Sequence, residues 1–179
     1  MRKKRPVWWF IFILFFTFGV AFGIGLVAEA FFTQTDSIWI CCFIIVTLMW
    51  LAFMGDIVAV AVAYAELPPF NAMASRKTKG AKTCIKLIQN SDKVSSILSD
   101  VLGDVCGIVS GAIGAALALM ITKGMWITDF QKIIIVVTVT ATIAALTVAV
   151  KSLAKKIAIK NCQGIVFAVG RFLSVFSKN

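Results

Sequence analysis

The chain has 179 residues, of which 60% are hydrophobic and 15% are charged, and its formal net charge is +10. About half of the residues of an average soluble domain are apolar, so this composition favours an integral membrane protein. The positive charge does not indicate nucleic-acid binding, because the basic residues flank apolar stretches and form no soluble basic face. The chain contains no histidine, and none of its five cysteines forms a CxxC pair, which argues against a soft-metal site and a disulfide framework.

Four stretches are long enough to cross a bilayer, because each holds about 18 or more largely apolar residues. They cover about residues 7–32, 38–65, 97–121 and 130–150. The first stretch is too long to be the apolar region of a signal peptide. We therefore predict an all-α integral membrane protein with one transmembrane domain of four helices.

The basic residues are distributed unequally between the two sides of these predicted spans. Sixteen of the 18 precede the first span, lie between the second and third, or follow the fourth. Only Lys123 and Lys132 lie in the connection between the third and fourth spans. Because cytoplasmic segments carry an excess of Lys and Arg, we expect both termini in the cytoplasm and the chain in the plasma membrane.

Two segments outside the spans, about residues 71–90 and 158–176, predict amphipathic helices that lie along the membrane surface. In the first, Ala81, Cys84 and Ile88 share one face, whereas lysines occupy the other. Such a helix buries its apolar face at the lipid boundary and holds its lysines near anionic headgroups. A solvated hairpin is the alternative for this segment. Asn90 begins a predicted break before the third span.

Two carboxylates lie within apolar spans, Asp56 in the second and Asp104 in the third. A charge at such a position costs roughly 3 kcal/mol on insertion scales, so it indicates a functional polar interior. At 1.5 Å per residue, the two lie roughly 13 Å and 10 Å from the cytoplasmic ends of their helices, so they can meet at one level. Without softer ligands nearby, they predict a site for a hard cation, namely Mg²⁺, Ca²⁺, Mn²⁺ or Na⁺.

Three further residues are candidate ligands of this metal site: Asp100, Ser110 and Thr147. Asp100 lies one turn from Asp104, and the alternative is that it faces interfacial water. Ser110 and Thr147 would be neutral ligands, although a membrane threonine often bonds back to its own helix. A structural ion pair between one of the acids and Lys151 is the alternative to a shared metal site.

Small residues form a stripe along the third span. Gly103, Gly107 and Gly111 make a double GxxxG pattern, which allows another helix to approach closely. We predict that a homodimer forms through these three glycines.

Several short motifs occur in a characteristic order along residues 55–176. They are Lys79-Gly80-Ala81-Lys82, the segment 86–93, Gly103-Asp104, and Val148–Ala154 followed by Gly170–Phe176. This order resembles the membrane domain of the cyclin M and CorB/CorC magnesium transporters. The resemblance implies binding and transport of Mg²⁺ by a homodimer, in a divergent member without the cytoplasmic regulatory module. Where that family has S-G-S-E, the asparagine of G-N and the glutamate of G-E, this chain has Gly55-Asp56, Asp104 and Thr147.

Two other functions remain open, and catalysis is not expected. The chain has no nucleotide-binding loop, nucleophile elbow or zinc motif, so we predict that it is not an enzyme. A small proton-coupled exporter of cationic compounds would also use a membrane carboxylate, but aromatic residues should then surround the acid. A non-transporting membrane subunit would use the glycine stripe to bind a partner.

Overall fold

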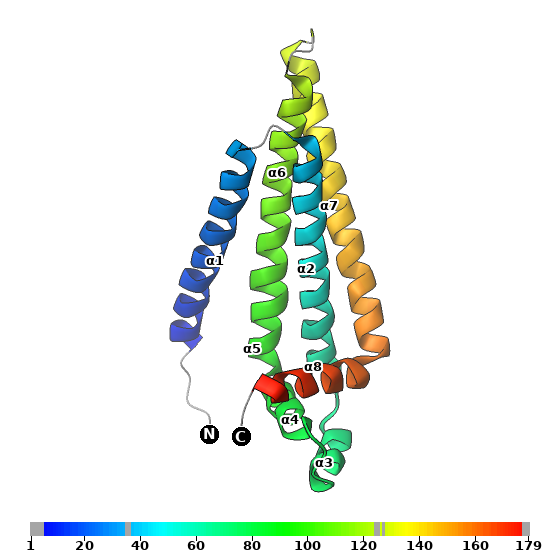
Figure 1. Ribbon diagram of the computed structural model, residues 1–179. Coiled ribbons are helices and arrows are strands. Elements are labelled where there is room, and N and C mark those ends of the chain that lie inside the picture. The colour runs from blue at the N-terminus through cyan, green and yellow to red at the C-terminus, as the bar shows by residue number, and fades with distance from the viewer. Residues whose placement is uncertain (1–5, 35–36, 124–125, 127, 177–179) are drawn as a thin grey trace.

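The computed structural model describes residues 6–34, 37–123, 126 and 128–176, without the side chains of residues 6–7, 29, 31–34 and 176. All regular structure in these residues is helical, which confirms the predicted all-α class (Figure 1). Five of the basic residues used to predict the topology lie outside the described residues, namely Arg2, Lys3, Lys4, Arg5 and Lys178.

Four helices are long and apolar enough to cross a membrane, as predicted. The third is continuous from Ser91 to Thr122 but changes its winding along its length. The helices α2, α6 and α7 pack together, and α1 lies beside α6 (Figure 1). The elements are α1 (Pro6–Gln34), α2 (Ile38–Tyr64), α5 (Ser91–Ser95), the π-helix η1 (Ser96–Gly103), α6 (Asp104–Thr122) and α7 (Asp129–Lys160).

The single helix predicted over residues 71–90 is wrong, because two helices occupy this region, α3 (Leu67–Ser75) and α4 (Ala81–Gln89). Between them, Lys77 has a φ of 56° and Gly80 a φ of 90°. A right-handed helix cannot continue through residues with positive φ. The prolines after Leu67 lie in the first turn of α3, where a missing N–H group costs no hydrogen bond.

The predicted C-terminal amphipathic helix is present as α8 (Cys162–Phe176). It begins later than residue 158, because α7 continues to Lys160. The helix α8 runs across the lower end of the bundle and contacts α4 and α2 (Figure 1). Glycines allow α4 and α8 to touch: a Cβ on Gly170 would overlap the Cys84 sulfur and lie 3.3 Å from the carbonyl oxygen of Gly80.

The described residues contain two separate apolar cores. The membrane core joins α1, α2 and α6, and its buried members are Ala28, Cys41, Ile45, Val105, Val109, Ile113 and Leu117. The second core lies at the end of the bundle that carries α3, α4 and α8, and we call this part of the molecule the base. The buried members of the base core are Ala61, Val62, Ala65, Phe70, Cys84, Ala158 and Val166.

Candidate functional site

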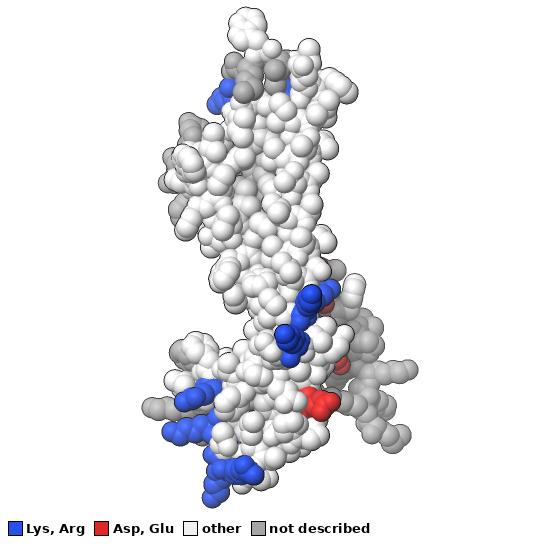
Figure 2. Space-filling model, turned by 90° about the vertical axis from the view of Figure 1, so that its right-hand side faces the viewer, with Lys and Arg blue, Asp and Glu red and all other residues white. Residues whose placement is uncertain are grey.

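A charge-free layer separates two charged ends of the molecule. Its length is set by three stretches of 18 residues without a charged side chain: Ile38–Gly55 in α2, Val105–Thr122 in α6 and Ile133–Val150 in α7. Each stretch measures about 27 Å as a helix, close to the thickness of a bilayer core. On the face seen in Figure 2, most charged side chains accordingly gather in the lower half of the molecule.

Three charged residues directly border this layer on one side: Asp56, Asp104 and Lys151. Asp56 and Lys151 directly follow the charge-free stretches of α2 and α7, and Asp104 directly precedes that of α6. All three therefore lie at the same end of the bundle. The two acids thus lie at a similar height along the bundle, as the sequence predicted, but no contact joins them among the described residues. The level itself is the edge of the apolar layer, next to the base, and not its middle.

Asp56 is completely buried, with a relative exposure of 0%. Its neighbours on α2 belong to the membrane core on one side and to the base core on the other. The hydroxyl of Ser99 donates a hydrogen bond of 2.6 Å to Oδ1 of Asp56. Oδ2 has no hydrogen-bond partner, and no described residue forms an ion pair with the carboxylate. A buried carboxylate without a counter-ion is costly by several kcal/mol, which makes this oxygen the candidate ligand atom.

Asp104 and Lys151 form an ion pair across α6 and α7. The Lys151 ammonium donates to Oδ1 of Asp104 at 2.6 Å. The Asp104 side chain is 64% exposed and that of Lys151 is 23% exposed. The ion-pair alternative that the sequence left open is thus the arrangement found for Asp104, whereas Asp56 is left without such a partner.

Gly103 lies between the buried carboxylate and this lysine. A Cβ on Gly103 would lie 3.3 Å from Oδ1 of Asp56 and 3.5 Å from Nζ of Lys151. Gly55 gives a similar close approach on α2, where a Cβ would lie 3.1 Å from the carbonyl oxygen of Leu98. Because both positions lack a side chain, three helices converge at the level of Asp56.

Ser99 is the polar partner of Asp56 that sequence reasoning missed. It lies in η1, where the helix is wound more widely than an α-helix. The sequence prediction assumed α-helical spacing throughout the third span, which set Asp100 and Asp104 on the inner face. The π-helix changes the phase of the following turns, so Ser99 faces Asp56 and the two acids are exposed. The one sequence feature that could have indicated Ser99 as a partner of Asp56 is its position four residues before Gly103.

The other three predicted ligands are not brought into contact with Asp56. Asp100 is exposed and forms no ion pair with a described residue. Thr147 donates to the carbonyl oxygen of Ile143 at 2.8 Å, as a membrane threonine often does. Ser110 is buried and its hydroxyl has no partner among the described residues, but it lies about two helical turns from Gly103.

The glycines of the third span face different neighbours. Gly103 is buried within the chain, and its Cβ position faces Asp56 and Lys151 of the same chain. A Cβ on Gly107 would lie 3.6 Å from the Thr147 methyl group, so this glycine faces α7 of the same chain. Gly111 has nothing within 4 Å of its Cβ position and remains available to another helix.

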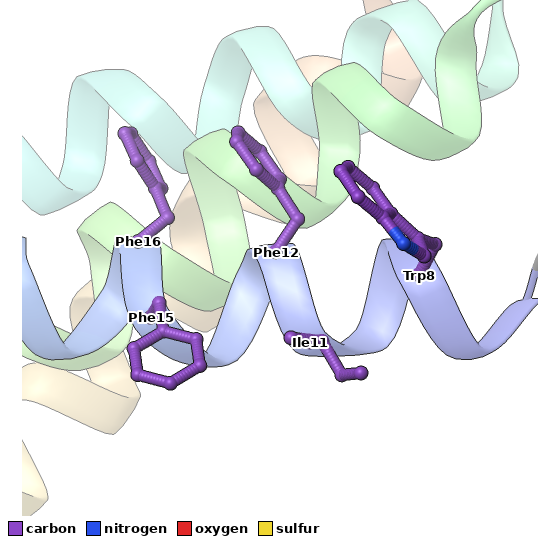
Figure 3. Close-up of a pocket in the computed structure, with 5 residues that line it drawn as sticks. All are labelled: Trp8, Ile11, Phe12, Phe15 and Phe16. Atoms are coloured by element: carbon purple, nitrogen blue, oxygen red, sulfur yellow. The ribbon is translucent and has the colours of Figure 1, made fainter.

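Aromatic residues line a cavity of about 390 Å³ on α1, away from Asp56. Trp8, Phe12 and Phe16 lie on one side of the α1 ribbon, and Ile11 and Phe15 lie on the other (Figure 3). The rings of Phe12 and Phe16 stack with their centroids 5.7 Å apart. No charged side chain lines this cavity, so it lacks the acid that an exporter of cationic compounds would need beside its aromatics.

Within the described residues, no cluster of three or more His, Cys, Asp or Glu side chains could hold a metal ion. The ligands at the level of Asp56 are therefore at most two carboxylates, a hydroxyl and main-chain oxygens. Together Asp56, Asp104 and Lys151 carry one net negative charge when all three are ionised. Comparison of the chain with models of protein families, with curated proteins and with solved structures gave no match.

Proposed function

We propose that this chain binds a hard cation at Asp56 and transports it across the membrane. The proposal is carried by one observation, the buried Oδ2 of Asp56 that lacks a partner. A cation at this oxygen would compensate the charge that burial makes costly. Mg²⁺, Ca²⁺, Mn²⁺ and Na⁺ all prefer oxygen ligands. Mg²⁺ is the first candidate because of the motif resemblance to magnesium transporters.

The set of ligands in this proposal is smaller than the set that the sequence predicted. Asp56 is the charged ligand, and the Ser99 hydroxyl, which already contacts its carboxylate, is the nearest neutral one. Asp104 contributes through its charge and through Lys151. Asp100, Ser110 and Thr147 are not part of the proposed first ligand set. In this proposal the chain is a transporter and not an enzyme, since its sequence carries no nucleotide-binding loop, nucleophile elbow or zinc motif.

The orientation and assembly belong to the same proposal. Sixteen basic residues on one side and two on the other support cytoplasmic termini in the plasma membrane. The start of α1 and the helix α8 lie at the same end of the bundle, which agrees with this topology (Figure 1). If the chain forms a homodimer, Gly111 is the glycine of the stripe with room for a second copy. The likeness to cyclin M and CorB/CorC transporters remains a prediction from short motifs.

The proposal is tested by following the melting temperature of the purified chain in detergent while Mg²⁺, Ca²⁺, Mn²⁺ or Na⁺ is added. A cation at a hundredfold excess over its dissociation constant should raise the melting temperature by roughly 5–10 °C. Asp56→Asn should remove this rise, because the amide keeps the shape of the side chain and loses its charge. The exposed Asp92 serves as control, and Asp92→Asn should keep the rise. An undiminished rise in Asp56→Asn would place the cation elsewhere.

A proton-coupled exporter is the second candidate. Asp56, Asp104 and Lys151 carry one net negative charge, which a single positive charge would neutralise. One proton on Asp56 would supply it as well as one monovalent cation. In that case no metal ion would stabilise the parent chain. Vesicles containing the chain would instead take up protons when a lipophilic cation such as tetraphenylphosphonium leaves them.

A further inference from the structure

Lys151 lies where it can serve either of two carboxylates. Its ammonium group is 2.6 Å from Asp104, and it approaches Asp56 across Gly103, which has no side chain to separate them. Both Oδ1 of Asp56 and Nζ of Lys151 lie within 3.5 Å of the position that a Cβ on Gly103 would take. The ammonium group and the buried carboxylate therefore border the same small space beside Gly103.

The two carboxylates differ in how much they need a counter-ion. Asp104 is 64% exposed, so water solvates it when the lysine leaves. Asp56 is 0% exposed, so it has no such compensation. An uncompensated buried charge is far more costly than an exposed one. A cation therefore gains more by compensating Asp56 than by pairing with Asp104, and the lysine and a bound ion should compete for the buried carboxylate.

We infer that Lys151 is a tethered cation that competes with the transported ion for Asp56, and that Asp104 holds the lysine while the ion is bound. This inference rests on the proposed cation site at Asp56. It deepens that proposal, because it makes Lys151 a determinant of affinity and of ion valence. The repulsion between the lysine and the ion scales with the charge of the ion. Lys151 therefore discriminates against a divalent ion more strongly than against a monovalent one.

The inference is tested with a double-mutant cycle of the full-length chain in detergent. The parent, Asp104→Asn, Lys151→Met and the double variant are titrated with Mg²⁺ and with Na⁺, and apparent dissociation constants are read from the melting temperature. In the parent background, Asp104→Asn should weaken ion binding at least tenfold, because the lysine then has Asp56 as its sole partner. In the Lys151→Met background, the same change should weaken binding less than about threefold.

Comparison of a monovalent with a divalent ion gives a second, independent test on the same variants. Lys151→Met should strengthen the binding of Na⁺ by about tenfold and that of Mg²⁺ by about the square of that factor. Lys156→Met and Asp92→Asn are the matched controls, since both remove an exposed charge from the same long helices. If Lys151→Met does not fold, Lys151→Gln takes its place in the cycle.

Equal effects of Asp104→Asn in both backgrounds would overturn the inference. A small equal effect would leave the ion pair a structural one, and a complete loss of binding in both would make Asp104 a direct ligand. Failure of the proposed function looks different: no ion would stabilise the parent, or Asp56→Asn would bind as the parent does. The two failures can therefore be told apart.

Discussion

The membrane layer and the base are built from the same chain but are stabilised in different ways. In the layer, large side chains face outward, such as Phe18, which is 66% exposed, and Val137, which is 58% exposed. In the base, Phe70, Cys84 and Val166 are at most 1% exposed. The layer thus resembles a set of helices solvated by lipid, whereas the base resembles the core of a soluble domain.

This difference explains where the polar site lies. Lipid solvates apolar side chains as well as a protein core does, so helices in the layer associate by packing of small residues. The base packs against the end of α2, and just above it η1 lies against Asp56, which is completely buried. The buried carboxylate therefore occurs at the junction, where three helices converge on Gly55 and Gly103.

The strongest test of the comparison removes one large side chain from each region. Phe70→Ala should cost about 3–5 kcal/mol, because it leaves a cavity in a closed core. Phe18→Ala should cost no more than about 0.5 kcal/mol, because its side chain contacts lipid or detergent in either state. Single-cysteine variants report the two regions separately, through Cys84 in the base and Cys106 in the layer. In Phe70→Ala, Cys84 should become reactive at a lower temperature than Cys106 does.

A second test concerns the contact between α4 and α8. Gly170→Val should lower the melting temperature of the base by several degrees, because the new side chain overlaps Cys84. Gly164→Val on the same helix is the control, since nothing lies within 4 Å of its Cβ position. If both variants melt alike, the glycine contact does not hold the base together.

The third test uses pH to probe the base through one thiol. Burial raises the pKa of the Cys84 thiol above its ordinary value. The folded state therefore holds this proton more tightly than the unfolded state does. The resulting stability is present below the pKa of the unfolded thiol and is lost as pH rises through that of the folded one. Between pH 7 and 9.5 the parent should lose more stability than Cys84→Ala does, as measured by the shift in melting temperature.

The smallest expected effect concerns the contact between α1 and α5. The Lys93 ammonium lies 5.1 Å from the centroid of the Trp9 ring, a cation–π contact worth about 0.5–1 kcal/mol at an exposed site. Lys93→Met should lower the melting temperature by about 2 °C. Lys86→Met, which removes another exposed lysine, should leave it unchanged. If Lys86→Met lowers the melting temperature more than Lys93→Met does, the positive charge of the lysines, and not this cation–π contact, stabilises the molecule.

The sequence by itself determined the four long helices and the level of the charged residues. Each span must satisfy its backbone hydrogen bonds internally within lipid, so length and hydropathy suffice to locate it whatever its neighbours are. The positions of Asp56, Asp104 and Lys151 follow directly from the ends of the charge-free stretches.

Only the tertiary structure decided which of these residues meet and which glycines are enclosed. The widened turns of η1 bring Ser99, and not Asp104, to Asp56, and they cannot be read from a pattern that assumes 3.6 residues per turn. The positive φ angles at Lys77 and Gly80 divide α3 from α4 and so allow the base to close beneath α2. Lys151 lies near both acids, and its pairing with Asp104 depends on contacts among three helices distant in the sequence.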